Sequence, residues 1–298
     1  MASLDISEFD GEGWSCPICG SERHRVMYDL RKKQTWFSVP GWIVRCADCG
    51  MWNKVLGENE DLEDAYGEEY SENFGDDECM ENSTTRTFFQ SVLKRIDGDG
   101  LPDSPRLLDI GAGTGTFMEE AIALGYEAEG IDLTQGFVEV AQKKGLKVRR
   151  QNVTELDGDE KYDVIAMMDI IEHVVDPVTI LKTMYASLKP GGKLVVFTPN
   201  HGSSVVLIAR LMEKFGAGFA VEEIFGSNHV CFFDTHTLPA AIEGAGFKTD
   251  SVWKFPYNPR RAALNISLPS LAAATVTDWV GYPFGAVFRM VHYAHKPK

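Results

Sequence analysis

The sequence lacks the features of a membrane or secreted protein. No apolar run approaches the roughly 18 residues that a helix needs to cross a bilayer. The first residues, Met-Ala-Ser-Leu-Asp-Ile-Ser-Glu, contain neither the basic region nor the apolar region of a signal peptide. We therefore expect a cytoplasmic protein. Its core should be of ordinary size, because 44% of the 298 residues are hydrophobic.

Positive charge is scarce as well. The chain has 29 Lys and Arg against 44 Asp and Glu, which gives a formal net charge of −15. Affinity for nucleic acid depends on Lys and Arg that neutralise phosphates, so this balance disfavours nucleic acid as a partner. Much of the excess comes from residues 58–81, which hold 12 acidic residues and no Lys or Arg. We expect residues 56–83 to form a solvated acidic linker.

Aromatic residues interrupt the acidic linker at helical spacing. Tyr66 and Tyr70 are four positions apart, and Phe74 follows at the same interval. This spacing places the three rings on one face of a helix. The linker is therefore expected either to dock through its aromatic face or to act as a lid over a bound substrate.

Cysteine is also sparse, yet four of the six cysteines are grouped. Two C-x-x-C-G knuckles, Cys16 to Gly20 and Cys46 to Gly50, have the spacing that lets two thiolates reach one ion. Strands are expected at 25–28 and 36–44, so residues 14–55 are predicted to be a zinc ribbon. The four metal ligands are Cys16, Cys19, Cys46 and Cys49. Four thiolates leave no open position, so the zinc is expected to be structural.

A strand, a glycine turn and a helix follow the linker. Leu107 to Ile110 is a short apolar strand, and a helical pattern opens at Thr116. Gly111, Gly113 and Gly115 lie between them, where the chain must turn tightly or approach a ligand closely. The helix N-terminus favours an anionic group such as a carboxylate. No P-loop and no G-x-S-x-G elbow occurs in the sequence.

Two acidic residues accompany this turn. Asp109 ends the first strand, and Asp132 ends a second strand over 127–131. An acid about 20 residues beyond a glycine turn is placed to accept hydrogen bonds from ribose hydroxyls. The dinucleotide pattern G-x-G-x-x-G would need glycine where Thr116 stands. The turn therefore suits a ligand that ends in a carboxylate better than a pyrophosphate.

Four motifs together resemble the class I S-adenosylmethionine-dependent methyltransferases. The first is Leu-Leu-Asp-Ile-Gly-Ala-Gly-Thr-Gly at 107–115, and the second is the acid at 132. The segment from Asp169 to Pro177, with its Glu-His-Val-Val-Asp-Pro, looks like the region after the family's fourth strand. Leu-Lys-Pro-Gly-Gly-Lys-Leu at 188–194 looks like the turn into the fifth strand. The core is most similar to the ubiquinone-pathway type, and the ribbon to zinc-ribbon methyltransferases of sugar and natural-product pathways.

This resemblance implies an α/β fold, a Rossmann-like sheet of seven strands whose final strand is antiparallel. The methyltransferase domain is expected over 84–298, with a substrate-side insertion at 199–245. Strands are expected at 107–110, 127–131, 146–150, 162–168, 193–198, 248–255 and 284–295. Helices are expected at 84–96, 115–124, 135–143, 176–188 and 203–215, followed by a loop over 217–228. A short strand at 229–233 and a helix capped by Thr235 complete the insertion.

Polar residues fall at the carboxyl ends of the parallel strands, where such sheets bind ligands. The resemblance gives the cofactor-binding residues as Asp109, Gly111, Gly113, Gly115, Asp132, Asn152 and Asp169. Asn152 would contact the adenine amino group, although the family often has Asp there. Asp169 would border the methionine part of the donor and the substrate. Thr198 ends the fifth strand nearby.

Histidine is the expected general base, because its ordinary pKa lies near neutrality. His173 follows the fourth strand, His201 follows the fifth, and His229 lies in the insertion. All three remain candidates. In many relatives the Glu-His pair is structural, whereas a histidine corresponding to His229 recurs in related small-molecule enzymes. His236 is the weakest candidate, because an outer helix is its expected position.

The sequence thus predicts an S-adenosylmethionine-dependent methyltransferase that acts on a small molecule. Transfer to oxygen in a sugar, quinone-like or natural-product scaffold is expected. An RNA methyltransferase guided by the mildly basic ribbon and a sugar C-methyltransferase are the alternatives. A non-enzymatic binding module and a nicotinamide-dependent oxidoreductase are the rivals from other classes. The absence of a [DN]-P-P-[FYW] tetrapeptide argues against methylation of DNA amines. The uncharged section within 262–288 suggests contact with an oily substrate or a membrane surface.

Overall fold

The computed structural model describes residues 13–31, 40–56, 82–256 and 268–298. Several sequence predictions lie outside these residues. They are the aromatic face of the acidic linker, part of the strand at 36–44 and part of the uncharged section. Within the described residues, no helix is long and apolar enough to span a membrane.

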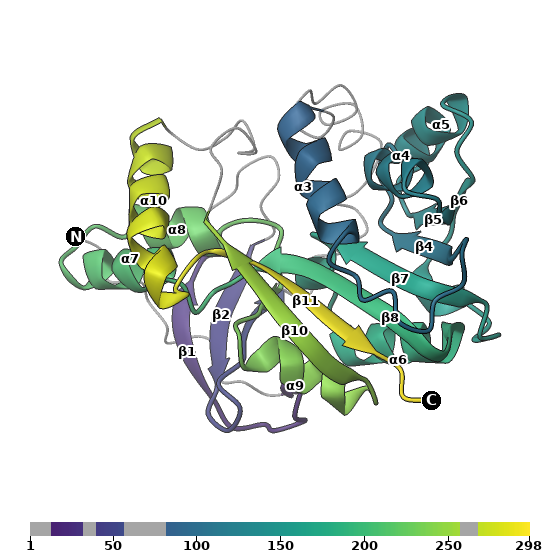
Figure 1. The fold of residues 1–298 in the computed structure, drawn as a ribbon. Coiled ribbons are helices and arrows are strands. Elements are labelled where there is room, and N and C mark those ends of the chain that lie inside the picture. Colours follow the sequence, from purple (N-terminus) through teal and green to yellow (C-terminus); the bar gives the residue numbers. More distant parts are fainter. Residues whose placement is uncertain (1–12, 32–39, 57–81, 257–267) are drawn as a thin grey trace.

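The main sheet has seven strands, as predicted (Figure 1). Their order is β10 (Lys248–Phe255), β11 (Arg289–His295), β8 (Leu188–Pro199), β7 (Tyr162–Met168), β4 (Arg106–Ile110), β5 (Glu127–Asp132) and β6 (Val148–Arg150). The strands from β8 to β6 pair in parallel, whereas β11 is antiparallel to both of its neighbours. This topology confirms the predicted class I methyltransferase sheet with its antiparallel last strand.

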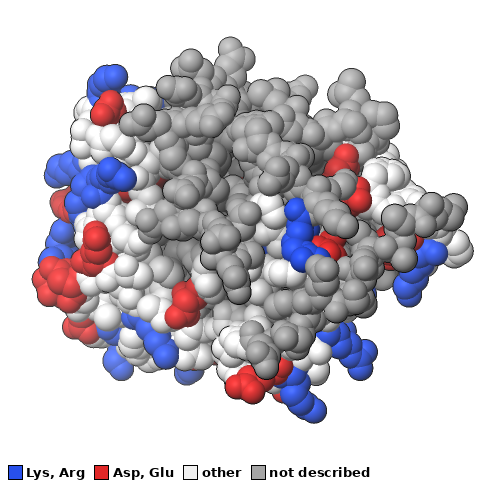
Figure 2. Space-filling view, turned by 180° about the vertical axis from the view of Figure 1, so that it is seen from behind, with Lys and Arg blue, Asp and Glu red and all other residues white. Residues whose placement is uncertain are grey.

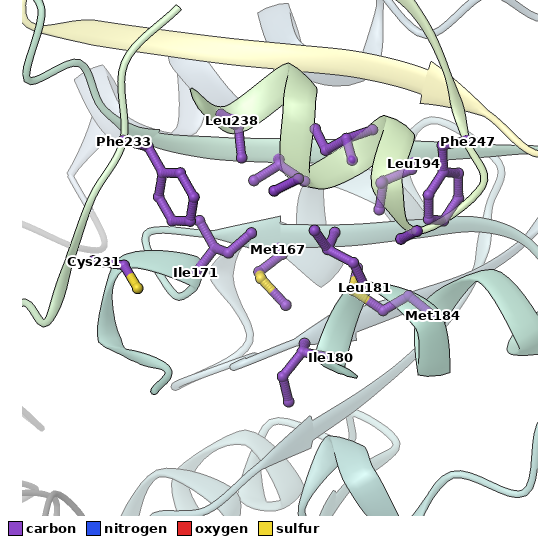
Figure 3. Packing of buried hydrophobic residues seen from close by; sticks show 14 of the residues in the cluster. Met167, Ile171, Ile180, Leu181, Met184, Leu194, Cys231, Phe233, Leu238 and Phe247 are labelled. Carbon is purple, nitrogen blue, oxygen red and sulfur yellow. The ribbon is translucent and has the colours of Figure 1, made fainter. Parts of the chain in front are cut away.

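Helices cover both faces of this sheet, which explains why its central strands are apolar on both sides. One face carries α3 (Ser83–Leu93), α4 (Thr116–Ala123) and α5 (Gln135–Lys143), and the other carries α6 (Pro177–Ser187) and α9 (Thr237–Gly244) (Figure 1). Leu107 and Ile165, in the middle of the sheet, have no exposed surface. Figure 3 shows the core between α6, α9 and the sheet, with Met184 and Leu238 among its members.

Several boundary predictions were wrong; β8, for example, begins at Leu188 rather than at 193. Three of the differences have a local reason. The last strand begins at Arg289 rather than at 284, because Tyr282–Phe284 forms a 3-10 turn (η5). Helix α9 is capped by Asp234 rather than by Thr235, since the Asp234 carboxylate accepts hydrogen bonds from the His236 and Thr237 backbone N–H groups at 2.9 and 2.8 Å. The predicted loop at 217–228 contains helix α8 (Phe219–Phe225).

A second sheet joins the N-terminal ribbon to the insertion. Its order is β1 (His24–Asp29), β2 (Gly41–Cys46), β3 (Trp52–Leu56) and β9 (Cys231–Phe232), all antiparallel. The strand expected at 229–233 is therefore present, but it pairs with the ribbon: Trp52 faces Phe232 and Asn53 faces Cys231. The ribbon and the core share one sheet, although they are far apart in the sequence.

Aromatic packing explains why α8 forms. Val221 and Phe225 of this helix are buried. The Phe225 ring stacks on Trp52 of the ribbon with centroids 5.5 Å apart, and it lies 5.7 Å from Tyr28. Burial of these rings against the ribbon is a tertiary effect that outweighs the local loop signal of the flanking glycines. Helix α8 also packs on α7 (Ser204–Lys214), which contacts α10 (Leu268–Gly281).

Candidate active site

Four parallel strands end along one edge of the main sheet, and each is followed by a polar residue or a glycine. Strands β8, β7, β4 and β5 are consecutive neighbours there. They lead into Asn200, Asp169, Gly111 and Asp132, respectively. The carboxyl edge of such a sheet is where a ligand binds. The structure therefore brings the predicted donor residues to a common edge.

The glycine turn has the conformation that the sequence predicted. Gly111, Gly113 and Gly115 have φ values of 71°, 54° and 88°, a region that residues with a side chain rarely adopt. A Cβ on Gly111 would lie 2.2 Å from the Ile170 side chain, so this glycine lets the loop after β7 pack on the turn. A Cβ on Gly113 would instead meet no atom of the described residues within 4 Å. The open space beside Gly113 can receive part of a ligand.

Two carboxyl groups lie behind this turn. The Asp132 carboxylate accepts hydrogen bonds from the Gly113 and Thr134 backbone N–H groups, both at 2.8 Å. Asp109 is buried, and its Oδ1 has no hydrogen-bond partner in the described part of the chain. Burial raises the pKa of Asp109 well above its usual range, and the nearby charge of Asp132 raises it further. A ligand that brings a positive charge and hydroxyl donors fits these two groups, and S-adenosylmethionine carries both.

Asn152 forms a local cap beside the same edge. It precedes a 3-10 turn at Val153–Glu155 (η2), and its Oδ1 accepts from the Thr154 backbone N–H and hydroxyl, both at 3.0 Å. These two bonds use the acceptor capacity of the amide oxygen. A contact between Asn152 and adenine would therefore have to come from its Nδ2 donor rather than from Oδ1.

Asp169 begins the loop after β7 in an unusual conformation. Its φ is 55°, which is uncommon for a residue other than glycine. Its backbone N–H donates to the Phe197 carbonyl at 2.9 Å, and its Oδ1 accepts from Arg289 Nη1 at 2.9 Å. Strain of this kind persists where surrounding contacts fix the chain, often at functional sites. Arg289 and Phe197 fix it here.

Glu172 lies deeper in the same loop, within a 3-10 turn at Ile171–His173 (η3). It is 1% exposed, and its Oε2 accepts from the Thr198 hydroxyl at 2.8 Å. Burial raises the pKa of Glu172 well above its usual range, and the negative charge of Asp169 acts in the same direction. Burial thus favours the protonated form of Glu172, in which the carboxyl group can donate a hydrogen bond.

The structure brings the three candidate histidines together. The rings of His173 and His229 meet edge to face with centroids 4.7 Å apart, and His201 lies 6.5 Å from His229. Burial lowers the pKa of His173 to about 4 and that of His201 to about 3, and it lowers the pKa of His229 well below its usual value. All three imidazoles are therefore neutral at pH 7, with lone pairs able to accept a proton. By contrast, His236 is exposed at the start of α9.

Three further residues at this site were not predicted from the sequence. Asn53 and Lys54 of β3 reach the segment that carries His229, and Arg289 of β11 binds Asp169. No local pattern indicated these roles, since Asn53 and Val230 are separated by 177 positions. The one available signal was the charged Lys54 in a short strand that also holds Trp52, Val55 and Leu56. It is 3% exposed, and burial lowers its pKa to about 7.

The four predicted metal ligands also converge. Their Sγ atoms all lie within 4.8 Å of one another, with Cys16 and Cys49 at 3.4 Å and Cys19 and Cys46 at 3.6 Å. A tetrahedral zinc site with Zn–S bonds of about 2.3 Å needs sulfur atoms about 3.8 Å apart. The cluster therefore fits a structural zinc ion. Glu172, His173 and His229 also have ligand atoms within 4.8 Å of one another, so they too could hold a metal ion.

Comparison with known proteins agrees with this geometry. Residues 82–252 match a family described as "Methyltransferase domain". A ubiquinone biosynthesis O-methyltransferase from Xanthomonas axonopodis pv. citri is 30% identical over 175 residues, which covers 56% of this chain and 72% of the relative. A ubiquinone biosynthesis O-methyltransferase from Caulobacter vibrioides is 30% identical over 184 residues, which covers 57% of this chain and 71% of the relative.

Solved structures show the same fold. One is a complex between a Haloferax volcanii Trm112 methyltransferase activator and a methyltransferase, with a TM-score of 0.56 and 14% identity, covering 81% of this chain and 100% of that chain. Another is a Thermotoga maritima S-adenosylmethionine-dependent methyltransferase, with a TM-score of 0.50 and 24% identity. The match covers 76% of this chain and 95% of that chain. Because the sequence match spans more than half of the chain, the protein belongs to the methyltransferase-domain family, and it is an S-adenosylmethionine-dependent enzyme of class I.

Proposed function

We propose that this enzyme methylates a hydroxyl group on a small, quinone-like acceptor. The observation that carries the proposal is the cluster of His173, His229 and Glu172 next to the glycine turn. Ile170 packs on Gly111, so the loop with Glu172 and His173 lies directly against the donor residues. The relatives named above are O-methyltransferases of ubiquinone biosynthesis, and they support oxygen as the methylated atom.

S-adenosylmethionine, when bound, supplies a methyl group on a positively charged sulfur. We assign Asp132 to the ribose hydroxyls, the Nδ2 of Asn152 to a ring nitrogen of adenine, and Asp109 to the positively charged end of the donor. Asp132 keeps unused acceptor capacity beyond its two backbone bonds. The open space beside Gly113 receives the carboxylate of the donor, near the N-terminus of α4.

His173 is our candidate for the general base. Its ring is hydrogen-bonded to the backbone of Asn228, which orients the imidazole within the site. The edge of His229 holds the ring in place. A ring nitrogen of His173 would accept the proton of the acceptor hydroxyl as the oxygen–methyl bond forms and the sulfur–methyl bond of the donor breaks, which would release S-adenosylhomocysteine.

An RNA substrate is not supported by the charge distribution. Figure 2 shows Lys and Arg as small groups interleaved with Asp and Glu at the rim of this face, and the described atoms in this view carry no broad basic patch. Several basic residues are engaged in ion pairs, including Arg23 with Asp48 and Arg31 with Asp29 on the ribbon. A continuous basic groove is what RNA binding would require.

An exposed apolar surface lies next to the acceptor site, on α7, α8, α10 and η5. The contributing residues are Leu207, Leu211, Phe215, Phe219, Val276, Trp279, Val280 and Phe284. Phe215 and Phe284 are 82% and 83% exposed. Figure 1 shows these helices together at one end of the molecule. Helix α7 is bonded to the segment after η5, because the Ser204 hydroxyl donates to the Ala286 carbonyl at 2.8 Å. Large apolar surfaces are unusual on soluble proteins. We propose that this one binds the hydrocarbon tail of the acceptor.

The test is a methyl-transfer assay with a pair of catechols, one bare and one with a long alkyl chain. A catechol supplies the adjacent ring hydroxyls of a reduced quinone-like compound. We expect methylation on oxygen for both probes, detected by mass spectrometry, and a lower KM for the tailed probe. The double substitution Phe215→Ser and Phe284→Ser should remove this KM difference without changing the KM of the bare catechol.

Two results would contradict the proposal. Methylation of neither catechol would exclude the acceptor class. Equal KM values for both probes in the unmodified enzyme would exclude the apolar surface as a tail-binding site, while leaving the methylated atom as proposed.

A further inference from the structure

The ribbon binds one short segment of the core through both backbone and side chains. The Lys54 backbone N–H donates to the Val230 carbonyl at 2.7 Å, and the Asn53 Nδ2 donates to the same carbonyl at 2.7 Å. The Lys54 ammonium group donates to the Ser227 carbonyl. His229 lies between these two anchored positions. The ribbon therefore holds the backbone on both sides of a candidate active-site histidine.

The other side of this segment is bound to the loop that carries Glu172 and His173. The Val230 backbone N–H donates to the Glu172 carbonyl at 2.8 Å, and the Cys231 thiol lies 3.3 Å from the Val174 carbonyl. Figure 3 shows Cys231 and Phe233 beside Ile171 of the same loop. The segment is thus held between the ribbon and the Glu-His loop, and this arrangement sets the ring of His229 against that of His173.

Asn53 is the central residue of this contact. It is 7% exposed, and its Oδ1 accepts from the Trp14 indole N–H at 3.1 Å while its Nδ2 binds Val230. Trp14 and Cys16 belong to the same apolar cluster as Val230 and Cys231. Asn53 therefore connects the base of the metal-ligand cluster to the segment that bears His229. When both the oxygen and the nitrogen of a buried side-chain amide are hydrogen-bonded, they favour one arrangement of the neighbouring groups.

We propose that the ribbon is a positioning element of the acceptor site, and that Asn53 is the positioning residue that sets His229 against His173. The inference rests on the proposed function for the chemical role of the two histidines. The ribbon then supports the acceptor side of the active site. Its loss or displacement should disturb the histidine pair and leave the donor residues of β4 and β5 in place.

The test compares Asn53→Leu with unmodified protein by NMR of histidine labelled with ¹³C at Cε1. Leucine has nearly the same shape as asparagine but cannot form either hydrogen bond. We expect the His173 and His229 resonances to shift, while that of exposed His236 stays in place. Affinity for S-adenosylhomocysteine should be unchanged by calorimetry, and zinc content should stay at one ion per chain. In the bare-catechol assay, kcat/KM should fall by at least about tenfold, because small displacements of catalytic groups are costly.

Asn82→Ala is the matched control, since it removes the helix cap of α3 far from the ribbon. It should lower thermal stability and leave the histidine resonances unchanged. Unchanged His173 and His229 resonances in Asn53→Leu would overturn the proposal, whatever happens to turnover. If Asn53→Leu fails to bind S-adenosylhomocysteine, the positioning claim is also wrong, because the effect is then not confined to the acceptor side. Absence of catechol turnover in every protein would instead contradict the proposed acceptor, and the NMR comparison would still decide the role of the ribbon.

Discussion

His173→Gln is expected to lower kcat for the catechol probe by about 100- to 10,000-fold, the usual contribution of a general base. Glutamine fills most of the ring's volume and can keep a hydrogen bond to the backbone of Asn228. It cannot accept the proton of the attacking hydroxyl with comparable basicity. Affinity for S-adenosylhomocysteine should stay unchanged, because we assign donor binding to Asp132 and the glycine turn.

His236→Gln is the matched control for this experiment. His236 is exposed at the start of α9, and we expect its replacement to leave kcat as it was. Steady-state kinetics measures the role of His173 as a base, and calorimetry measures whether the residue also supports donor binding. Full kcat in His173→Gln would refute its assignment as the base, and a similar loss in His229→Gln alone would transfer that role to His229. Loss of donor affinity in His173→Gln would show that the residue has a structural role.

Lys54→Met should change how stability depends on pH, and by a large amount. Burial lowers the pKa of Lys54 from 10.5 to about 7. Between pH 7 and 10.5 the unfolded chain holds a proton on Lys54 that the folded chain does not hold. The free energy of unfolding therefore rises with pH in this range, and Lys54 destabilises the folded protein most near pH 7. Below pH 7 both states are protonated and the effect is constant. The imidazoles of His173 and His229 face this group, and both are neutral throughout the window.

The measured quantity is the difference in free energy of unfolding between the unmodified protein and Lys54→Met. We expect the unmodified protein to gain stability relative to the variant by about 1.4 kcal/mol per pH unit, or about 3 kcal/mol from pH 7 to 9.5. Taking the difference between the two proteins cancels the pH-dependent contribution of other groups, such as Tyr293, whose pKa is raised by burial. Denaturant unfolding at several pH values measures this slope. A difference that does not vary with pH would show that Lys54 is not buried in the folded protein.

Most of the main sheet could be predicted from the sequence, because its signals are local. Helix α5 and strands β7 and β10 have the predicted boundaries. The glycine turn was equally clear, because only glycine tolerates three left-handed positions in five residues. Helix α8 was missed because its stability comes from Trp52, which is distant in the sequence.

The acceptor site was only partly predictable for the same reason. The sequence indicated three histidines as separate candidates, but it could not show that the segment leading into β9 places His229 against His173. That arrangement depends on the pairing of β3 with β9 across the chain. Asn53 and Arg289 look like ordinary polar residues in strands, and only the folded chain reveals their contacts with Val230 and Asp169.

The most direct test of the central claim is calorimetric titration of S-adenosylhomocysteine into the unmodified enzyme, Gly113→Ala and Gly125→Ala. Gly113 and Gly125 both have positive φ values, 54° and 93°, and at either position a Cβ would meet no atom within 4 Å in the part of the chain that the structure describes. Only at Gly113 would that Cβ enter the space assigned to the donor. We predict micromolar binding by the unmodified enzyme and Gly125→Ala, and a loss of at least about 1.4 kcal/mol, or tenfold, for Gly113→Ala. Equal affinity in all three proteins, or binding of NAD in place of S-adenosylhomocysteine, would contradict the account.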